Sequence, residues 1–167
     1  FFKLAPAITL IGVMGSYGKS TVTHLIYSML KRSFVNYPDQ GLFLIDPDST
    51  NGALTHLKKI KKGDVVMARI PEYLIPHYYE IHISPHVAVI TSPISFNILE
   101  FQTHNNFVVG SDEVMDHIKS QGDVRAKMLR VRGSLVPADW HLPTQIVHTR
   151  ENSALALQAS QLFKVPI

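Results

Sequence analysis

The chain contains no cysteine among its 167 residues, which excludes both a disulfide framework and a thiolate metal site. It has no apolar run that approaches the roughly 20 residues needed to span a bilayer. Its first residues also do not read as a basic-then-apolar signal peptide. We therefore expect a cytoplasmic protein that does not enter a membrane.

Charge of either sign is sparse, with a formal net charge of +3. The one basic cluster lies between a predicted helix and a predicted strand and carries no interleaved aromatic residues, which favours a solvated helix end over a nucleic-acid surface. Hydrophobic residues make up 46% of the chain, enough to bury the core of a single globular domain, residues 1–167. The basic cluster comprises Lys58, Lys59, Lys61 and Lys62.

A glycine-rich segment from Gly12 to Thr21 reads Gly-Val-Met-Gly-Ser-Tyr-Gly-Lys-Ser-Thr. In such a turn, backbone N–H groups and a helix N-terminus hold a phosphate, Lys19 reaches the outer phosphates, and the Ser20 hydroxyl binds magnesium. The generic template has a glycine six residues before the lysine, where this chain has Val13. The match is therefore incomplete, and a solvated lysine in a tight turn is the alternative.

The flanking periodicity favours the phosphate-binding interpretation. A nearly continuous apolar run at 7–11 is typical of a buried parallel strand. After Lys19, apolar residues from Val22 to Leu30 recur at three- and four-residue spacing, as on one face of a helix. Strand, glycine turn and helix is the order that this type of phosphate site requires.

Strand and helix patterns alternate along the rest of the chain. This alternation predicts an α/β fold, with a mainly parallel sheet flanked by helices and ligands at the carboxyl ends of the strands. The predicted strands are 42–46, 64–69, 87–91, 134–137 and 145–148, and the predicted helices are 50–60, 111–120 with Ser111 as N-cap, 123–131 and 151–163.

Four segments, in order, resemble the central ATP-binding domain of the Mur ligases and their folylpolyglutamate synthetase relatives. They are Ile11–Leu30, with the family's phosphate loop; Ser84–Thr91, with its following strand; Val124–Arg130, with its Ala-Lys helix; and His148–Asn152, with its turn before the last helix. The resemblance spans essentially the whole chain and implies a P-loop NTPase-like fold. Within the family, Thr50–Leu54 and Ile70–Leu74 are most similar to the D-glutamate-adding enzyme.

The resemblance implies a ligase that uses ATP to phosphorylate a substrate carboxylate, which an amino acid amine then attacks to form an amide. The implied substrates are a UDP-linked muramoyl precursor of peptidoglycan and D-glutamate, and the implied cofactors are ATP and magnesium. Because the chain begins with Phe1, we expect a domain excised from a three-domain, monomeric ligase whose flanking domains hold both substrates.

The resemblance also assigns roles to individual residues. Lys19 would be catalytic at the outer phosphates, and Ser20 would bind the first magnesium. Lys127 matches the lysine that the family carbamylates beside the second magnesium, although a helix-surface lysine is the alternative. Asn152 matches an asparagine near the adenine, or is an ordinary residue of a helix N-terminus. The residues expected to hold ATP also include Gly15, Ser16, Tyr17, Gly18 and Thr21.

The chain departs from the family at two magnesium-site positions. Arg69 stands where the family has a glutamate ligand, and Asn97 stands where it has a catalytic histidine. A cation in place of a ligand weakens a magnesium site, because unlike charges about 4 Å apart are worth roughly 4 kcal/mol at an effective dielectric near 20. Arg69 can instead neutralise phosphate. Glu72 is either a replacement acid or a solvated loop acid.

Two further function classes remain open. The run Leu42–Asp46, four apolar residues and an aspartate, fits the Walker B pattern of generic P-loop NTPases, although Asp46 also suits a turn at a strand end. The other alternative is a degenerate relative without ligation, which either binds nucleotide or phosphate or keeps the fold as a scaffold for a partner.

Overall fold

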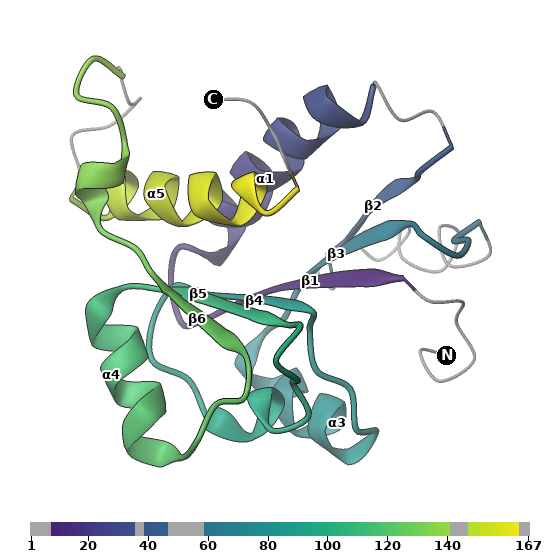
Figure 1. Cartoon of the computed structure of the whole chain (residues 1–167), viewed down its shortest axis with the longest axis vertical. Coiled ribbons are helices and arrows are strands. Elements are labelled where there is room, and N and C mark those ends of the chain that lie inside the picture. Colours follow the sequence, from purple (N-terminus) through teal and green to yellow (C-terminus); the bar gives the residue numbers. More distant parts are fainter. Residues whose placement is uncertain (1–7, 36–38, 47–58, 141–146, 164–167) are drawn as a thin grey trace.

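A computed structural model describes residues 8–35, 39–46, 59–140 and 147–163. Its centre is a six-stranded sheet in which every pairing is parallel, with the strand order β2-β3-β1-β4-β5-β6 (Figure 1). The predicted α/β class with a parallel sheet is confirmed. The strands are β1 (Thr9–Met14), β2 (Leu42–Ile45), β3 (Val65–Arg69), β4 (Val87–Ile90), β5 (Phe107–Gly110) and β6 (Lys127–Arg130).

Helices cover both faces of the sheet. Helices α1 and α5 lie on one face, and α3 and α4 lie on the other (Figure 1). The two faces of β1 are buried in different cores: Ile11 and Val13 pack with α1 and α5, and Leu10 and Met14 with α3 and α4. The helices are α1 (Lys19–Phe34), α3 (Ile75–Glu80), α4 (Asp112–Gln121) and α5 (Val147–Gln161), with short 3-10 turns η1 (Glu72–Leu74), η2 (Phe96–Leu99) and η3 (Gly133–Leu135).

The register of the sheet places the ends of the central strands together. Val13 of β1 is level with Arg69 of β3, and Met14 is level with Ile90 of β4. The loops that follow β1, β3 and β4 therefore leave the same edge of the sheet. In an open parallel sheet this is the edge at which ligands bind.

Strand β1 is longer than the sequence predicts. It runs through Gly12, Val13 and Met14, so the loop begins only at Gly15. Val13 is fully buried inside the sheet, which explains why this chain needs no glycine there. Gly12 is instead required for packing, because an added Cβ would lie 2.6 Å from Cγ of Pro85.

Several predicted elements are confirmed with small shifts. The strands at 42–46, 64–69 and 87–91 correspond to β2, β3 and β4, and the helix at 151–163 corresponds to α5, which starts four residues earlier. Ser111 is the N-cap of α4, and its Oγ accepts a hydrogen bond from the Val114 N–H. The predicted helix at 50–60 lies outside the described residues up to 58, and Lys59 and Ile60 are not helical.

Three predicted elements are wrong. The segment 123–131, predicted as a helix, contains strand β6 at the edge of the sheet, and the segment 134–137, predicted as a strand, overlaps the 3-10 turn η3. Of the strand predicted at 145–148, Val147 and His148 belong to α5, and 145–146 lie outside the described residues. Strand β5 was not predicted.

Within the described ranges, the structure contains no helix with both the length and the apolar character that a membrane crossing requires.

Candidate functional site

The loop after β1 joins two left-handed glycines to the start of a helix. We call Gly15–Thr21 the phosphate loop. Gly15 has a φ of 125° and Gly18 a φ of 76°, conformations that L side chains rarely adopt. Gly18 is the N-cap of α1, and no described side chain caps this helix.

Backbone donors of this helix start are available to a ligand. The first hydrogen bond of α1 runs from the Val22 N–H to the Gly18 carbonyl. The N–H groups of Lys19, Ser20 and Thr21 precede it and have no acceptor within the helix. The first turn carries no acidic residue, and the helix dipole favours an anion there.

The two residues that follow β4, Thr91 and Ser92, form hydrogen bonds with the phosphate loop and the end of β1. The Thr91 hydroxyl is within hydrogen-bond distance of the Met14 carbonyl, at 3.0 Å, and of the Tyr17 carbonyl. The Ser92 Oγ accepts a 2.6 Å hydrogen bond from the Ser16 N–H. A Cβ on Gly15 would lie 2.7 Å from the Ser92 backbone nitrogen. These contacts fix the loop to the neighbouring strand.

The Lys19 ammonium folds back over the phosphate loop. It donates to the carbonyl of Gly15 and, at 3.3 Å, to that of Ser16. These carbonyls place the positive charge at the mouth of the loop. From this position the ammonium group can exchange a carbonyl for an anionic phosphate oxygen as its hydrogen-bond acceptor.

Helix α5 brings Asn152, for which the resemblance implies a place near the adenine, against Gly18 of the phosphate loop. Asn152 is 9% exposed, and a Cβ on Gly18 would lie 2.7 Å from its Oδ1. Asn152 and Tyr17 line a cavity of about 40 Å³, which has room for water but not for a nucleotide base. The segment His148–Asn152, which resembles a family turn, already belongs to α5.

Arg69 and Asp46 form an ion pair next to the loop. Oδ1 of Asp46 accepts hydrogen bonds from Nε of Arg69 at 3.0 Å and from Nη2 at 2.7 Å. Nη1 of Arg69 is 3.4 Å from the Oγ of Ser20. A guanidinium therefore contacts the hydroxyl expected to bind magnesium. The side chains are 13% and 29% exposed, so solvent screens this charge only in part.

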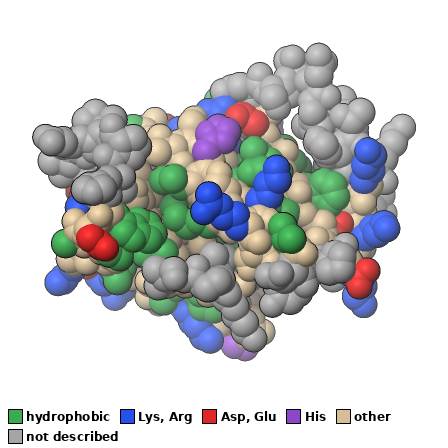
Figure 2. Space-filling model, turned by 90° about the horizontal axis from the view of Figure 1, so that it is seen from above, with side chains coloured by type: hydrophobic (Ala, Val, Ile, Leu, Met, Phe, Trp, Pro, Cys, Tyr) green, Lys and Arg blue, Asp and Glu red, His purple; other side chains and the backbone are tan. Residues whose placement is uncertain are grey.

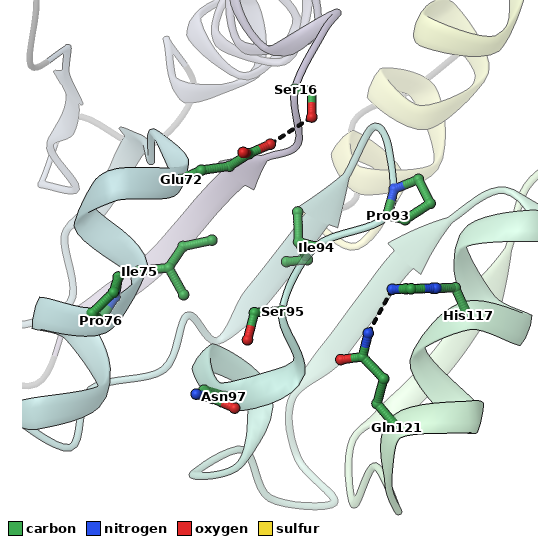
Figure 3. A pocket seen from close by; sticks show the side chains of 10 residues that line it. All are labelled: Ser16, Glu72, Ile75, Pro76, Pro93, Ile94, Ser95, Asn97, His117 and Gln121. Carbon is green, nitrogen blue, oxygen red and sulfur yellow. Dashed lines mark hydrogen bonds between the residues drawn. The ribbon is translucent and has the colours of Figure 1, made fainter.

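Glu72, the first residue of η1, also contacts the phosphate loop. Its Oε1 accepts a 2.5 Å hydrogen bond from the Ser16 hydroxyl, and the Glu72 side chain is otherwise exposed to solvent. Glu72, Ser16 and Asn97 line one cavity of about 360 Å³ (Figure 3). The structure thus brings Asn97, from η2, to the same edge as the phosphate loop.

Lys127 lies away from the phosphate loop. It starts β6, where its backbone N–H donates to the Asn106 carbonyl and its ammonium lies 5.5 Å from the centre of the Phe107 ring. Through β5 and β4, it is level with Ile11, near the middle of β1 and three strands away. At about 4.8 Å between strands, this is roughly 14 Å from β1. The structure does not bring Lys127 to Ser20.

Other charged groups form separate clusters. Arg130 pairs with Asp116 at 2.6 Å and with Asp112 at 3.2 Å, and Arg132 pairs with Asp112 at 2.9 Å. Hydrogen bonds from Arg130 and Arg132 lower the pKa of the exposed Asp112 carboxyl. Among the described residues, no group of three or more histidine, aspartate or glutamate side chains is arranged to hold a metal ion.

Basic side chains are dispersed on the side of the molecule that is uppermost in Figure 1. Figure 2 shows them separated by hydrophobic and neutral surface on this face. Among the described residues, the basic side chains on this face form no continuous stripe of the kind that follows a nucleic-acid backbone.

Sequence reasoning missed Thr91 and Ser92 as part of the site. Their signal was present, because two hydroxyl residues directly follow the buried strand β4. The strand order that brings this strand end beside β1 was the missing information.

Comparison of the chain with protein-family models and with curated proteins finds no match in either case.

Proposed function

We propose that this chain is a nucleotide-binding domain that holds the phosphate groups of ATP at the phosphate loop. The observation that carries the proposal is the start of α1. Its N-cap is the left-handed Gly18, its first N–H groups have no helical acceptor, and Lys19 folds over it. The strand order supports the same proposal. Strands β1 and β4 are parallel neighbours, so the loops that follow them meet at the carboxyl edge of the sheet.

The residues present fit the phosphates better than they fit magnesium. Backbone donors, a lysine and the Arg69 guanidinium all favour an anion. Magnesium prefers oxygen ligands, and the Ser20 oxygen has a guanidinium nitrogen 3.4 Å away. Where magnesium does bind, it would neutralise charge on the phosphates, with Ser20 as its ligand from the loop.

The geometry supports a nucleotide-binding module without ligase activity better than a complete ligase. A ligase of the Mur type would need the carbamylated lysine beside its magnesium, and Lys127 is placed on the edge strand instead. Ligation of D-glutamate to a muramoyl precursor remains a second proposal that rests on the resemblance. In that case, another residue must take the part assigned to Lys127.

A generic P-loop NTPase that uses Asp46 is supported less. Asp46 follows β2, and β3 separates this strand from β1. The Asp46 carboxylate also accepts two N–H groups of Arg69. It would have to leave this ion pair before it could orient a magnesium ion.

The experiment compares ATP binding by the wild type, Lys19→Ala and Lys127→Ala. Loss of a charge-assisted contact is worth about 2 kcal/mol, so Lys19→Ala should weaken ATP binding roughly thirtyfold in titration calorimetry. Lys127→Ala is the matched control, since it removes the same charge from the edge strand, and it should bind like the wild type. Equal affinity of the wild type and Lys19→Ala would remove the phosphate-loop proposal.

A further inference from the structure

The cavity beside the phosphate loop is lined by residues from the segments that follow β1, β3 and β4 and from helices α3 and α4. Figure 3 shows Ser16 and Glu72 at one end, Asn97 of η2 at the other, and His117 with Gln121 on α4 along the side. The volume is about 360 Å³, within the range of small-molecule sites. We call it the acceptor pocket.

The acceptor pocket has both apolar and polar lining residues. Ile75 and Ile94 are 4% and 5% exposed and offer hydrocarbon surface. His117 Nε2 and the Gln121 amide are 2.5 Å apart and present a hydrogen-bonded pair. Ser95 and Asn97 add a hydroxyl and an amide. This lining suits a small molecule with a carbon skeleton and several hydrogen-bonding groups.

The charge of the lining restricts the occupant further. Its ten described residues include one carboxylate, that of Glu72, and no lysine or arginine. A carboxylate placed beside Glu72 would be repelled by it, although solvent screens part of this repulsion because Glu72 is exposed. The pocket therefore disfavours the anionic acceptor that a Mur-type ligase would phosphorylate.

Glu72 is oriented towards a hydroxyl at the phosphate loop. Its Oε1 already accepts an O–H hydrogen bond from Ser16, whose backbone is part of that loop. A second hydroxyl in the pocket can be bound by the same carboxylate next to the outer phosphate. A carboxylate that accepts the proton of an attacking hydroxyl is the usual arrangement in phosphoryl transfer to alcohols.

We propose that the acceptor pocket binds a neutral, hydroxyl-bearing small molecule and that Glu72 makes it a phosphoryl acceptor. The inference rests on ATP binding at the phosphate loop. The acceptor oxygen attacks the γ-phosphorus and forms a new P–O bond. The bond from that phosphorus to the β–γ bridging oxygen breaks, its electron pair leaves with ADP, and the hydroxyl proton passes to Glu72.

The test uses glycerol and glycerate, two probes that differ in one carboxylate. Each is supplied in large excess with ATP and magnesium, and products are identified by phosphorus NMR and mass spectrometry. Hydroxylamine is added to trap any acyl phosphate as a hydroxamate. The expected product is glycerol phosphate, with no hydroxamate from glycerate.

Variants assign the effect to Glu72. Glu72→Gln should lower glycerol phosphate formation by at least about a hundredfold, as expected for loss of a general base, without weakening ATP binding. Glu72→Asp, which keeps the carboxylate, should retain more activity than Glu72→Gln. Glu80→Gln is the matched control, because its 69% exposed side chain lies on α3 outside the pocket lining, and it should behave like the wild type.

The outcomes separate the inference from the function on which it rests. A wild type that does not bind ATP overturns both. A wild type that binds ATP but forms no glycerol phosphate, or that forms a hydroxamate from glycerate, overturns the acceptor inference alone. Equal rates for the wild type and Glu72→Gln overturn it as well.

Discussion

Replacing Arg69 with glutamate should make ATP binding depend strongly on magnesium. In the wild type, the Arg69 guanidinium forms an ion pair with Asp46 and lies 3.4 Å from the Ser20 hydroxyl. The Arg69 guanidinium, although paired with Asp46, already places a positive charge next to Ser20, where a magnesium ion would bind. We therefore expect the wild type to bind ATP with nearly the same affinity in magnesium and in EDTA.

The magnitude follows from the charges. Arg69→Glu changes the side chain by two charge units and leaves the Asp46 carboxylate next to a second carboxylate instead of a cation. At about 8 Å and an effective dielectric near 20, each unit is worth roughly 2 kcal/mol against a phosphate charge. Partial solvent exposure lowers the total to about 2 kcal/mol, which is roughly a thirtyfold loss of ATP affinity in EDTA. Magnesium, bound by the new pair of carboxylates, should restore the ATP affinity of the variant.

Titration calorimetry with ATP, in magnesium and in EDTA, measures this difference directly. Arg125→Glu is the matched control, because Arg125 is exposed and precedes β6 at the amino ends of the strands. For this variant, the ratio of the ATP affinity in magnesium to that in EDTA should equal the wild-type ratio. A wild type that already binds ATP tenfold more tightly in magnesium than in EDTA would refute the reasoning. In that case, Glu72 or Asp46 would be the acid that holds the ion.

Two further predictions concern stability. Gly15→Ala places a Cβ 2.7 Å from the Ser92 nitrogen at a φ of 125°, so urea denaturation should show a loss of roughly 1–3 kcal/mol; a wild-type midpoint would contradict the strained conformation. Burial lowers the pKa of His86 below its ordinary 6.5, and its Nδ1 accepts the Leu10 N–H. Because the folded state binds the proton less well than the unfolded state, the free energy of unfolding should be highest above about pH 6.5 and decrease as the pH falls below it. His86→Gln should flatten this slope, and parallel pH profiles for the two proteins would exclude His86 as the cause.

Local pattern was enough to predict the elements that form the centre of the site. Strand β1, the phosphate loop and α1 each have a strong apolar period or a glycine requirement within a few residues. Ser111 could likewise be identified as an N-cap from its neighbours alone. These features depend on contacts within one turn or one strand, so the sequence expresses them directly.

Edge strand β6 shows where the pattern fails. Lys127 and Arg130 are exposed, and only Met128 and Leu129 between them are partly buried. Two adjacent apolar residues fit one face of a helix as well as they fit a strand. Pairing with β5 decides between them, and that pairing joins residues 20 positions apart.

The Arg69–Asp46 pair was also beyond the sequence, although both residues were recognised as candidates. They lie 23 positions apart, and only the pairing of β2 with β3 brings their strand ends together. Glu72 presents the same problem at a greater separation, 56 positions from Ser16. Such contacts follow from strand order rather than from any local propensity.

The hydrogen bonds that join Thr91 and Ser92 to the phosphate loop have a consequence for folding. The loop has its binding conformation only after β4 has docked beside β1, so a chain in which that pair is open has the glycines but not the site. A ligand that binds only the docked form stabilises it by mass action. Saturating ATP should therefore slow amide hydrogen exchange first in β1 and β4, and the edge strands β2 and β6 should follow only as far as they unfold together with this pair.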